Sequence, residues 1–98
     1  MGTAARKVRI PDSVTGFIRG THPYLKRKIK SSLKMILEAP TLGKELRDDL
    51  LGLRSFRVSK FRIIYRVRKN VIEVVAIGPR ERIYEETLVI VRREQATQ

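Results

Sequence analysis

The sequence contains no cysteine, a single histidine and no apolar run long enough to span a membrane. The absence of cysteine excludes disulfides, thiolate metal sites and catalysis by a thiol. The first residues, MGTAARKVRI, hold no apolar stretch of signal-peptide length. These absences predict a cytoplasmic protein that does not bind membranes, and nothing in the pattern calls for a metal or another cofactor.

Acidic residues are also scarce. The chain has 22 Lys plus Arg against 10 Asp plus Glu, a formal net charge of +12. Like charges repel one another within a compact chain, and a polyanion or an acidic partner relieves that repulsion. The charge therefore predicts binding to nucleic acid, to the ribosome or to an acidic protein. With 98 residues, we expect one domain spanning residues 1–98.

The first half of the chain predicts a short strand and two helices. Residues 6–11 (RKVRIP) are typical of a short strand, and residues 12–20 of a weak helix. A longer helix is predicted from Thr21, as its N-cap, up to Pro40. Its apolar residues recur at helical spacing: Leu25, Ile29, Leu33, Ile36 and Leu37. His22 falls where this helix begins, and we interpret it as structural.

After a loop or short helical segment at 41–52, the apolar period changes from helical to two. This pattern predicts strands at 53–58, 61–67 and 71–77, joined by two-residue turns. The fold class is therefore α+β, with an N-terminal helical hairpin packed on a small twisted, mainly antiparallel sheet.

The middle strand divides its side chains between two faces. We assign Phe61, Ile63, Tyr65 and Val67 to the face under the helices, which makes Tyr65 a packing residue. The arginines of the other face are expected to point into an open hollow. The last strand is apolar on both faces and therefore predicted to be interior, with Ile72 and Val74 on one face and Val71, Val75 and Ile77 on the other.

A combination of motifs gives the sequence a family resemblance. They are Gly52-Leu53-Arg54, Phe61-Arg62-Ile63-Ile64-Tyr65, Gly78-Pro79-Arg80 and Tyr84. In this combination the chain resembles the RelE/ParE toxin superfamily of prokaryotic toxin–antitoxin modules. The resemblance extends over nearly the whole chain and implies two N-terminal helices on an antiparallel sheet.

The resemblance implies one of two activities. RelE-like members cleave messenger RNA in the ribosomal decoding site, by attack of a 2′-hydroxyl on the adjacent phosphate and without a metal. ParE-like members inhibit DNA gyrase and do not cut RNA. An inactive RNA-binding relative is a further alternative. The implied partners are a cognate acidic antitoxin with the ribosome and messenger RNA, or else DNA gyrase.

The resemblance also implies roles for particular residues. Arg62 would hold the scissile phosphate, Arg80 would stabilise the leaving oxygen, and Tyr84 would stack on or orient a base. RelE-like nucleases often carry lysines on the strand before the hairpin, whereas this strand has arginine there, so Arg57 or Lys60 is the candidate substitute. A guanidinium is a poor proton acceptor, and the general base is left open.

Further candidates surround these residues. Glu81 and Glu85, beside Tyr84, are alternative bases. We predict RNA contacts from Arg54, Arg66, Arg82 and Lys44, although alternating arginines on a strand are often only a solvated face. Leu88 to Val91 form an apolar run. The resemblance implies a helix there, whereas Val89, Ile90 and Val91 favour extended structure. In either conformation the run is a candidate docking edge for an antitoxin or a second copy. Residues 92–98 are predicted to be disordered.

Overall fold

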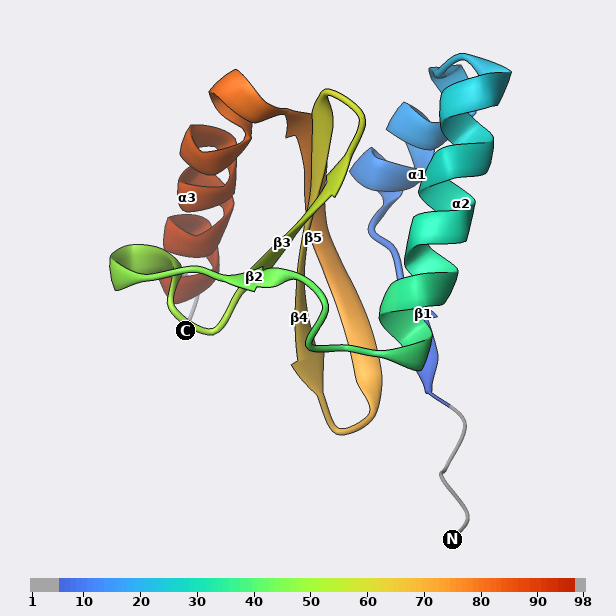
Figure 1. Cartoon of the computed structure of the whole chain (residues 1–98). Coiled ribbons are helices and arrows are strands. Elements are labelled where there is room, and N and C mark those ends of the chain that lie inside the picture. Colours follow the sequence, from blue (N-terminus) through green and yellow to red (C-terminus); the bar gives the residue numbers. More distant parts are fainter. Residues whose placement is uncertain (1–5, 97–98) are drawn as a thin grey trace, which may run out of the picture.

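The computed structural model describes residues 6–96, which fold into three layers with a sheet between two layers of helices (Figure 1). The elements in chain order are β1 (Lys7–Arg9), α1 (Asp12–Gly20), α2 (Pro23–Glu38), β2 (Lys44–Glu45), the 3-10 helix η1 (Asp48–Leu50), β3 (Arg54–Val58), β4 (Phe61–Arg68), β5 (Val71–Pro79) and α3 (Arg80–Ala96). The predicted α+β class, helical hairpin and three long strands are confirmed. Within residues 6–96, no helix has the length and apolar character needed to cross a membrane.

The sheet has five strands in the order β1-β5-β4-β3-β2. β1 runs parallel to β5, and the other pairs are antiparallel, as the prediction of a mainly antiparallel sheet requires. Positive φ angles of 58° at Ser59, and of 46° and 65° at Lys69 and Asn70, form the two tight turns that the sequence predicted. β5 is interior, as expected, because β1 and β4 flank it.

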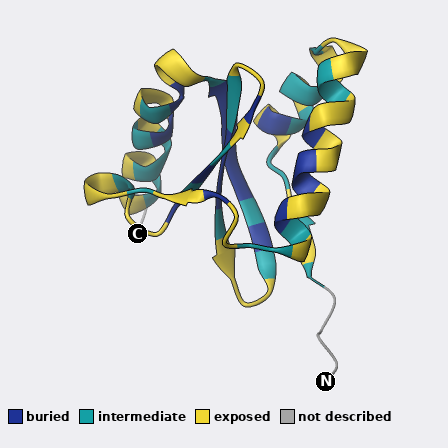
Figure 2. Cartoon of the chain, viewed as in Figure 1, coloured by how far each residue is buried: buried dark blue, intermediate teal, exposed yellow. Residues whose placement is uncertain are grey.

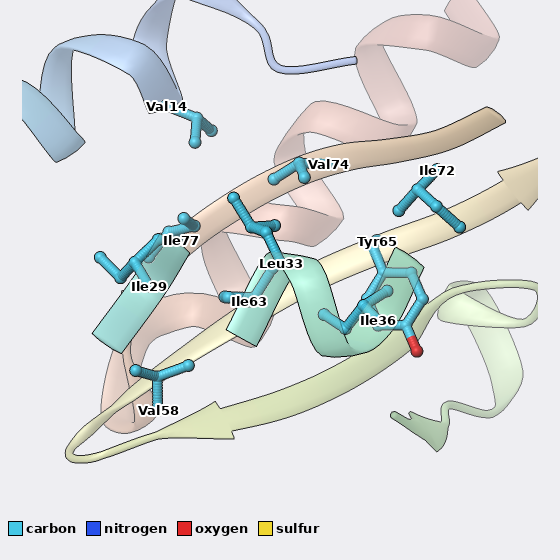
Figure 3. Close-up of a cluster of buried hydrophobic side chains, with 10 residues drawn as sticks. All are labelled: Val14, Ile29, Leu33, Ile36, Val58, Ile63, Tyr65, Ile72, Val74 and Ile77. Carbon is cyan, nitrogen blue, oxygen red and sulfur yellow. The ribbon is translucent and has the colours of Figure 1, made fainter. Parts of the chain in front are cut away.

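α1 and α2 cover one face of the sheet and bury its apolar side chains there (Figure 3). His22, rather than the expected Thr21, is the N-cap of α2: its Nδ1 accepts a hydrogen bond from the backbone N–H of Tyr24 at 3.1 Å. This contact gives His22 the structural role that the sequence predicted. We call the buried cluster beneath these helices the hairpin-side core; it comprises Val14, Ile29, Leu33, Ile36, Val58, Ile63, Tyr65, Ile72, Val74 and Ile77.

Tyr65 fixes the loop after α2 to this core. Its ring is fully buried, its hydroxyl donates to Pro40 O at 2.7 Å, and the same oxygen accepts from Gly43 N–H at 2.9 Å. A Cβ at position 43 would lie 2.7 Å from the ring, so only glycine fits there. Burial raises the pKa of Tyr65 above its ordinary value, and this effect outweighs the hydrogen bond from Gly43 and the charge of Arg54, which both lower it. The prediction that Tyr65 is a packing residue is confirmed.

The C-terminal segment differs from the prediction. Residues 88–91 are helical rather than extended, and residues 92–96 continue α3 instead of being disordered; residues 97 and 98 lie outside the described part. The helix propensity penalty of a β-branched residue is at most about 0.7 kcal/mol. For Val89, Ile90 and Val91 together it is about 2 kcal/mol. The complete burial of Ile83 contributes about 1.5–3 kcal/mol, and Ile90 and Val91 add to it because they also pack against buried residues of the sheet. Packing therefore overrides local preference.

α3 covers the face that the sequence predicted to be an open hollow (Figure 2). Beneath it lies a second buried cluster, the α3-side core, formed by Leu53, Ile64, Val75, Ala76 and Ile83. Leu46, Leu50, Ile90 and Val91 pack against this core. One part of the arginine-bearing face that stays open lies where α3 begins, beside the β3–β4 turn.

The face assignment of β5 was wrong at Ile77. The register with β4 shifts between Ile64, opposite Ala76, and Tyr65, opposite Val74. Val75 is therefore an extra residue in β5, a β-bulge that turns the strand by one position. Ile77 consequently joins Val74 in the hairpin-side core. Val67 lies opposite Ile72, on the face that the sequence assigned to it, but it is exposed there instead of being buried under the helices.

Candidate functional site: a basic pocket at the end of the sheet

The candidate site is a pocket of about 360 Å³ where the β3–β4 turn meets the start of α3. The register places Arg57 of β3 opposite Arg62 of β4, and Arg62 opposite Gly78 of β5. Arg80 follows two residues after Gly78, as the first residue of α3. The residues that line the pocket are Arg57, Ser59, Lys60, Phe61, Arg62, Arg80 and Glu81. The pocket thus brings together four of the five predicted catalytic residues.

The position of Arg80 depends on contacts at the C-terminal end of β5. The backbone N–H of Arg80 donates to Lys60 O at 3.2 Å, which ties the helix start to the β3–β4 turn. A Cβ at Gly78 would lie 3.0 Å from Ile83 Cδ1, so the glycine allows α3 to approach the sheet closely. The Gly-Pro-Arg motif is therefore a tight strand-to-helix junction that aims the first turn of α3 at the pocket.

The pocket concentrates uncompensated positive charge. Among residues 6–96, no carboxylate lies within ion-pair distance of Arg57, Lys60, Arg62 or Arg80. Glu81 also lines the pocket but forms no ion pair with them. Like charges directly opposite each other on neighbouring strands destabilise a sheet, so the Arg57 and Arg62 pair has a cost in the isolated protein. Guanidinium groups arranged in this way suit a phosphate group, which they bind through several charge-assisted hydrogen bonds.

Tyr84, the fifth predicted catalytic residue, lies on α3 but is not among the residues that line the pocket. Its hydroxyl is 3.1 Å from Ser55 Oγ of β3, and its ring packs against the α3-side core. Ser55 is only 2% exposed, so this hydrogen bond satisfies a buried hydroxyl. The bond joins the second turn of α3 to the strand that carries Arg57.

The residues predicted to contact RNA lie outside the pocket. Arg54 donates from its guanidinium to Gly43 O at 2.8 Å and to Thr41 O at 3.3 Å, which holds the loop after α2. Lys44 is exposed on β2, and Arg82 is exposed on α3. None of these three side chains lines the pocket.

Arg66, the fourth of these residues, belongs to an internal ion-pair network. Its guanidinium donates to Glu73 Oε1 at 2.7 Å and to both carboxylate oxygens of Glu94 at 3.0 Å, and its side chain is 18% exposed. The bond to Glu94 is the main reason that the pKa of Arg66 is raised. The hydrogen bond from Arg66 likewise holds the pKa of Glu73 below its ordinary value. Arg66 therefore fastens the C-terminal part of α3 to the sheet.

Sequence reasoning missed three polar or aromatic contributors. Ser59 and Phe61 line the pocket, and Ser55 holds Tyr84. The predicted two-residue turn could have indicated Ser59 and Phe61, since Ser59 lies in that turn and Phe61 directly follows it. Ser55 carried no such signal, because its partner is 29 positions away in the sequence.

The described part of the chain contains no group of three or more His, Cys, Asp or Glu side chains that could hold a metal ion. The polar groups that line the pocket are guanidinium, ammonium, carboxylate and hydroxyl groups. These groups can bind and neutralise a phosphate, and Glu81 or Lys60 can exchange a proton.

Comparison with known proteins identifies relatives. The family of ParE toxins of type II toxin–antitoxin systems (parDE) matches residues 18–84. No curated protein sequence matches the chain significantly. The E. coli toxin RelE, as a double Arg-to-Ala mutant in the free state, is 19% identical with a TM-score of 0.72, and the match covers 93% of this chain and 98% of RelE.

Two toxin–antitoxin complexes have similar structures. The RelBE2 complex of Mycobacterium tuberculosis matches with 20% identity and a TM-score of 0.69, over 79% of this chain and all (100%) of that chain. The YoeB–YefM complex of Staphylococcus aureus matches with 23% identity and a TM-score of 0.64, over 76% of this chain and 97% of that chain. At these identities the similarity establishes the fold.

Proposed function

The chain belongs to the ParE toxin family of type II toxin–antitoxin systems, and from its pocket we propose that this toxin is an endoribonuclease acting on messenger RNA at the ribosome. The observation that supports the proposal is the convergence of Arg57, Arg62 and Arg80 on one pocket without carboxylate partners in the described chain. A purely structural arginine cluster is expected to be neutralised, as Arg66 is by Glu73 and Glu94. A pocket left positive suits a polyanionic substrate.

The proposed reaction is an internal transfer of the phosphate. The ribose 2′-oxygen forms a bond to the adjacent phosphorus, and the bond from phosphorus to the 5′-oxygen of the next nucleotide breaks. The products are a 2′,3′-cyclic phosphate and a free 5′-hydroxyl. A base must take the 2′-hydroxyl proton, a cation must stabilise the charged phosphorane, and the 5′-oxygen must gain a proton.

We assign the roles to these residues as part of the proposal. Arg62 and Arg57, opposite each other on β4 and β3, bind the non-bridging oxygens of the phosphate and stabilise the charge that develops on them. Arg80, at the start of α3, stabilises the departing 5′-oxygen. An arginine remains protonated under all ordinary conditions and therefore acts electrostatically.

In this proposal the other two ionisable residues that line the pocket, Glu81 and Lys60, transfer the protons. Glu81 is the carboxylate available to accept the 2′-hydroxyl proton. Lys60, in the turn, is the donor toward the leaving oxygen. Tyr84 is a positioning residue in this scheme, because its hydroxyl is held by Ser55.

We further propose that an acidic antitoxin silences the toxin in the cytoplasm. The net charge of +12 gives an acidic chain a strong electrostatic attraction to this surface. The RelBE2 and YoeB–YefM complexes are toxins bound to antitoxins, which supports a partner of that kind.

Inhibition of DNA gyrase is the second candidate, and the match to the ParE toxin family favours it. In that case the arginines of the pocket contact a protein surface and no bond in RNA is broken. The two candidates differ in what happens to messenger RNA in a cell that makes the toxin.

Primer extension on messenger RNA after induction of the toxin distinguishes them. We expect discrete cuts with the natural toxin and none with Arg62→Ala or Arg80→Ala. Arg68→Ala is the matched control, since Arg68 is an exposed arginine on the same strand and outside the pocket, and it should leave the cuts unchanged. Growth arrest with intact messages and a DNA-damage response would support gyrase inhibition instead.

A further inference from the structure

The outer surface of α3 differs in charge from the molecule as a whole. The helix carries four arginines and four glutamates, so its charges balance, whereas the whole chain has a net charge of +12. α3 forms the outer layer on one side of the sheet, and its outward surface is largely exposed (Figure 2). A second copy of the chain can therefore approach α3 with less of the like-charge repulsion that other parts of the surface exert.

The charged residues of this surface form two stripes along the helix. Glu85 and Arg92 are seven residues apart, and so are Glu86 and Arg93. Seven residues make almost two whole turns, so the two members of each pair lie on the same side of the helix. Val89, which is 50% exposed, lies midway between the two glutamates and the two arginines.

The pattern does not serve pairing within the helix. Exposed helices are stabilised when Glu precedes Arg or Lys by four residues. Val89 occupies that position for Glu85, and it also stands four residues before Arg93. Glu85, Glu86 and Arg93 form no ion pair with any other residue in the range 6–96. Their charges are thus available to another molecule.

Two copies of this surface complement each other. Antiparallel packing of two α3 helices, with a two-fold axis at Val89, places Glu85 of each copy opposite Arg92 of the other. The same packing places Glu86 opposite Arg93. A two-fold axis repeats every contact, so four pairs of opposite charge surround a central pair of valines. Parallel packing in register would instead place like charges side by side.

A hollow beside α3 gives a second copy further surface to cover. It has a volume of about 320 Å³ and lies between η1 and α3, with Leu51, Leu88 and Arg92 among its lining residues. Leu51 is 72% exposed, and exposed apolar surface favours a partner that covers it. The ion pair of Arg92 with Asp49 is long, at 3.9 Å, and both side chains are exposed, so it competes weakly for Arg92.

From this pattern, we infer that the toxin binds a second copy of itself through α3, as an antiparallel two-fold dimer centred on Val89. Arg80, at the start of α3, lies nine residues from that axis. With a rise of about 1.5 Å per residue, the two Arg80 residues are roughly 27 Å apart along the helices. The dimer therefore carries a basic pocket at each end and leaves both open. Its formation does not depend on the proposed nuclease function.

Sedimentation velocity of the purified toxin over a range of concentrations tests the dimer with two charge-reversed variants. One combines Glu85→Arg with Glu86→Arg, and the other combines Arg92→Glu with Arg93→Glu. Each variant alone places like charges opposite each other, and we expect its dimer Kd to rise at least about tenfold, or roughly 1.4 kcal/mol. An equimolar mixture of the two should form a heterodimer as tight as the natural dimer, since all four pairs are then opposite in charge.

The matched control combines Lys30→Glu with Lys34→Glu on α2, at the other side of the sheet, where both lysines are exposed. It lowers the net charge by the same amount as Arg92→Glu with Arg93→Glu and should not raise the dimer Kd. A natural toxin that is monomeric at every concentration, a mixture without heterodimer, or a control that dissociates as the reversed variants do would each overturn the proposal.

Disulfide cross-linking supplies a second readout that changes no charge. The natural chain has no cysteine, so Val89→Cys introduces a single thiol. A residue at the two-fold axis meets its own copy. Oxidation by dissolved oxygen with copper phenanthroline should therefore link Val89→Cys chains at least about tenfold faster than Leu42→Cys chains. Leu42, in the loop after α2, is 47% exposed and serves as the control.

Equal rates of cross-linking would contradict an axis at Val89. If the toxin dimerises as expected but does not cut RNA, the dimer stands and the nuclease assignment fails.

Discussion

Arg57 and Arg62 face each other across β3 and β4 with no carboxylate within ion-pair distance in the described chain. Side-chain pairs in this position contribute about 0.2–1 kcal/mol, and like charges contribute unfavourably. Functional sites often retain groups that destabilise the fold, because binding or catalysis requires them.

This repulsion leads to a prediction for stability. Arg62→Ala should raise the free energy of unfolding by a few tenths of a kcal/mol, up to about 1 kcal/mol, while it removes cleavage. Urea denaturation of the purified protein measures the change. Arg68→Ala removes a similar side chain from the exposed end of the same strand, where the Arg68 guanidinium lies 3.8 Å from the Glu73 carboxylate. This substitution should not raise the free energy of unfolding. A stability loss in Arg62→Ala would mean that Arg62 is a structural residue.

Tyr84 and Ser55 provide a second test of a single contact. Tyr84→Phe leaves the buried Ser55 hydroxyl without its partner, which should cost about 1–3 kcal/mol. If Tyr84 acts by positioning α3, Ser55→Ala should lower the rate constant of cleavage as Tyr84→Phe does. The loss of the cleavage rate constant in the double variant, expressed as a free energy, should then be smaller than the sum of the losses in the two single variants, as a coupled pair requires. An intact rate in Ser55→Ala beside a large loss in Tyr84→Phe would show that the hydroxyl acts on RNA directly.

The elements differ in how well local sequence specifies them. α2 and the two hairpins follow from apolar spacing and turn residues, which are local signals. α3 does not follow from such signals, because Val89, Ile90 and Val91 favour a strand locally. The segment is helical because Ile90 and Val91 pack against the α3-side core.

Two other features of the fold arise from long-range contacts. The bulge at Val75 inserts one residue into β5, and alternating apolar residues on both faces give no local sign of it. The ion pair from Arg66 to Glu94 joins residues 28 positions apart. At the site, the resemblance placed Arg62 and Arg80 together, but the bond that fixes Tyr84 required the folded chain.

The attachment of β4 to β5 and α3 should depend on pH. The pKa of Glu73 is lowered, mainly by the hydrogen bond from Arg66, so folding favours its charged form. That contribution is present above the ordinary pKa of about 4.5 and is lost as the pH falls below it toward the lower value of the folded state. Thermal unfolding from pH 7 down to acid should show a steeper loss of stability than in Glu73→Gln. If the melting temperature fell equally with pH in the natural protein and in Glu73→Gln, the Glu73 carboxylate would not stabilise the fold in this way.

At the scale of the whole molecule, the net charge of +12 makes association with nucleic acid sensitive to salt. Each phosphate neutralised on a single strand contributes about −0.7 to the slope of log K against log salt. With Arg57, Arg62 and Arg80 on phosphates, a slope of about −2 is expected from the pocket alone.

Binding of a non-cleavable RNA across a range of salt concentrations measures that slope. Arg62→Ala should reduce its magnitude by about 0.7, whereas Arg68→Ala should leave it unchanged. An equal effect of the two substitutions would indicate diffuse attraction to the whole surface in place of a defined phosphate site.

The decisive measurement is cleavage of a messenger RNA, on ribosomes, that carries a single 2′-deoxy nucleotide on the 5′ side of a mapped cut. Because the proposed attack uses the 2′-oxygen, the toxin should cut the unmodified message to leave a 2′,3′-cyclic phosphate and should fail at the modified position alone. Cutting that persists at the modified position, or a message that the toxin never cuts, would contradict a nuclease built on Arg57, Arg62 and Arg80.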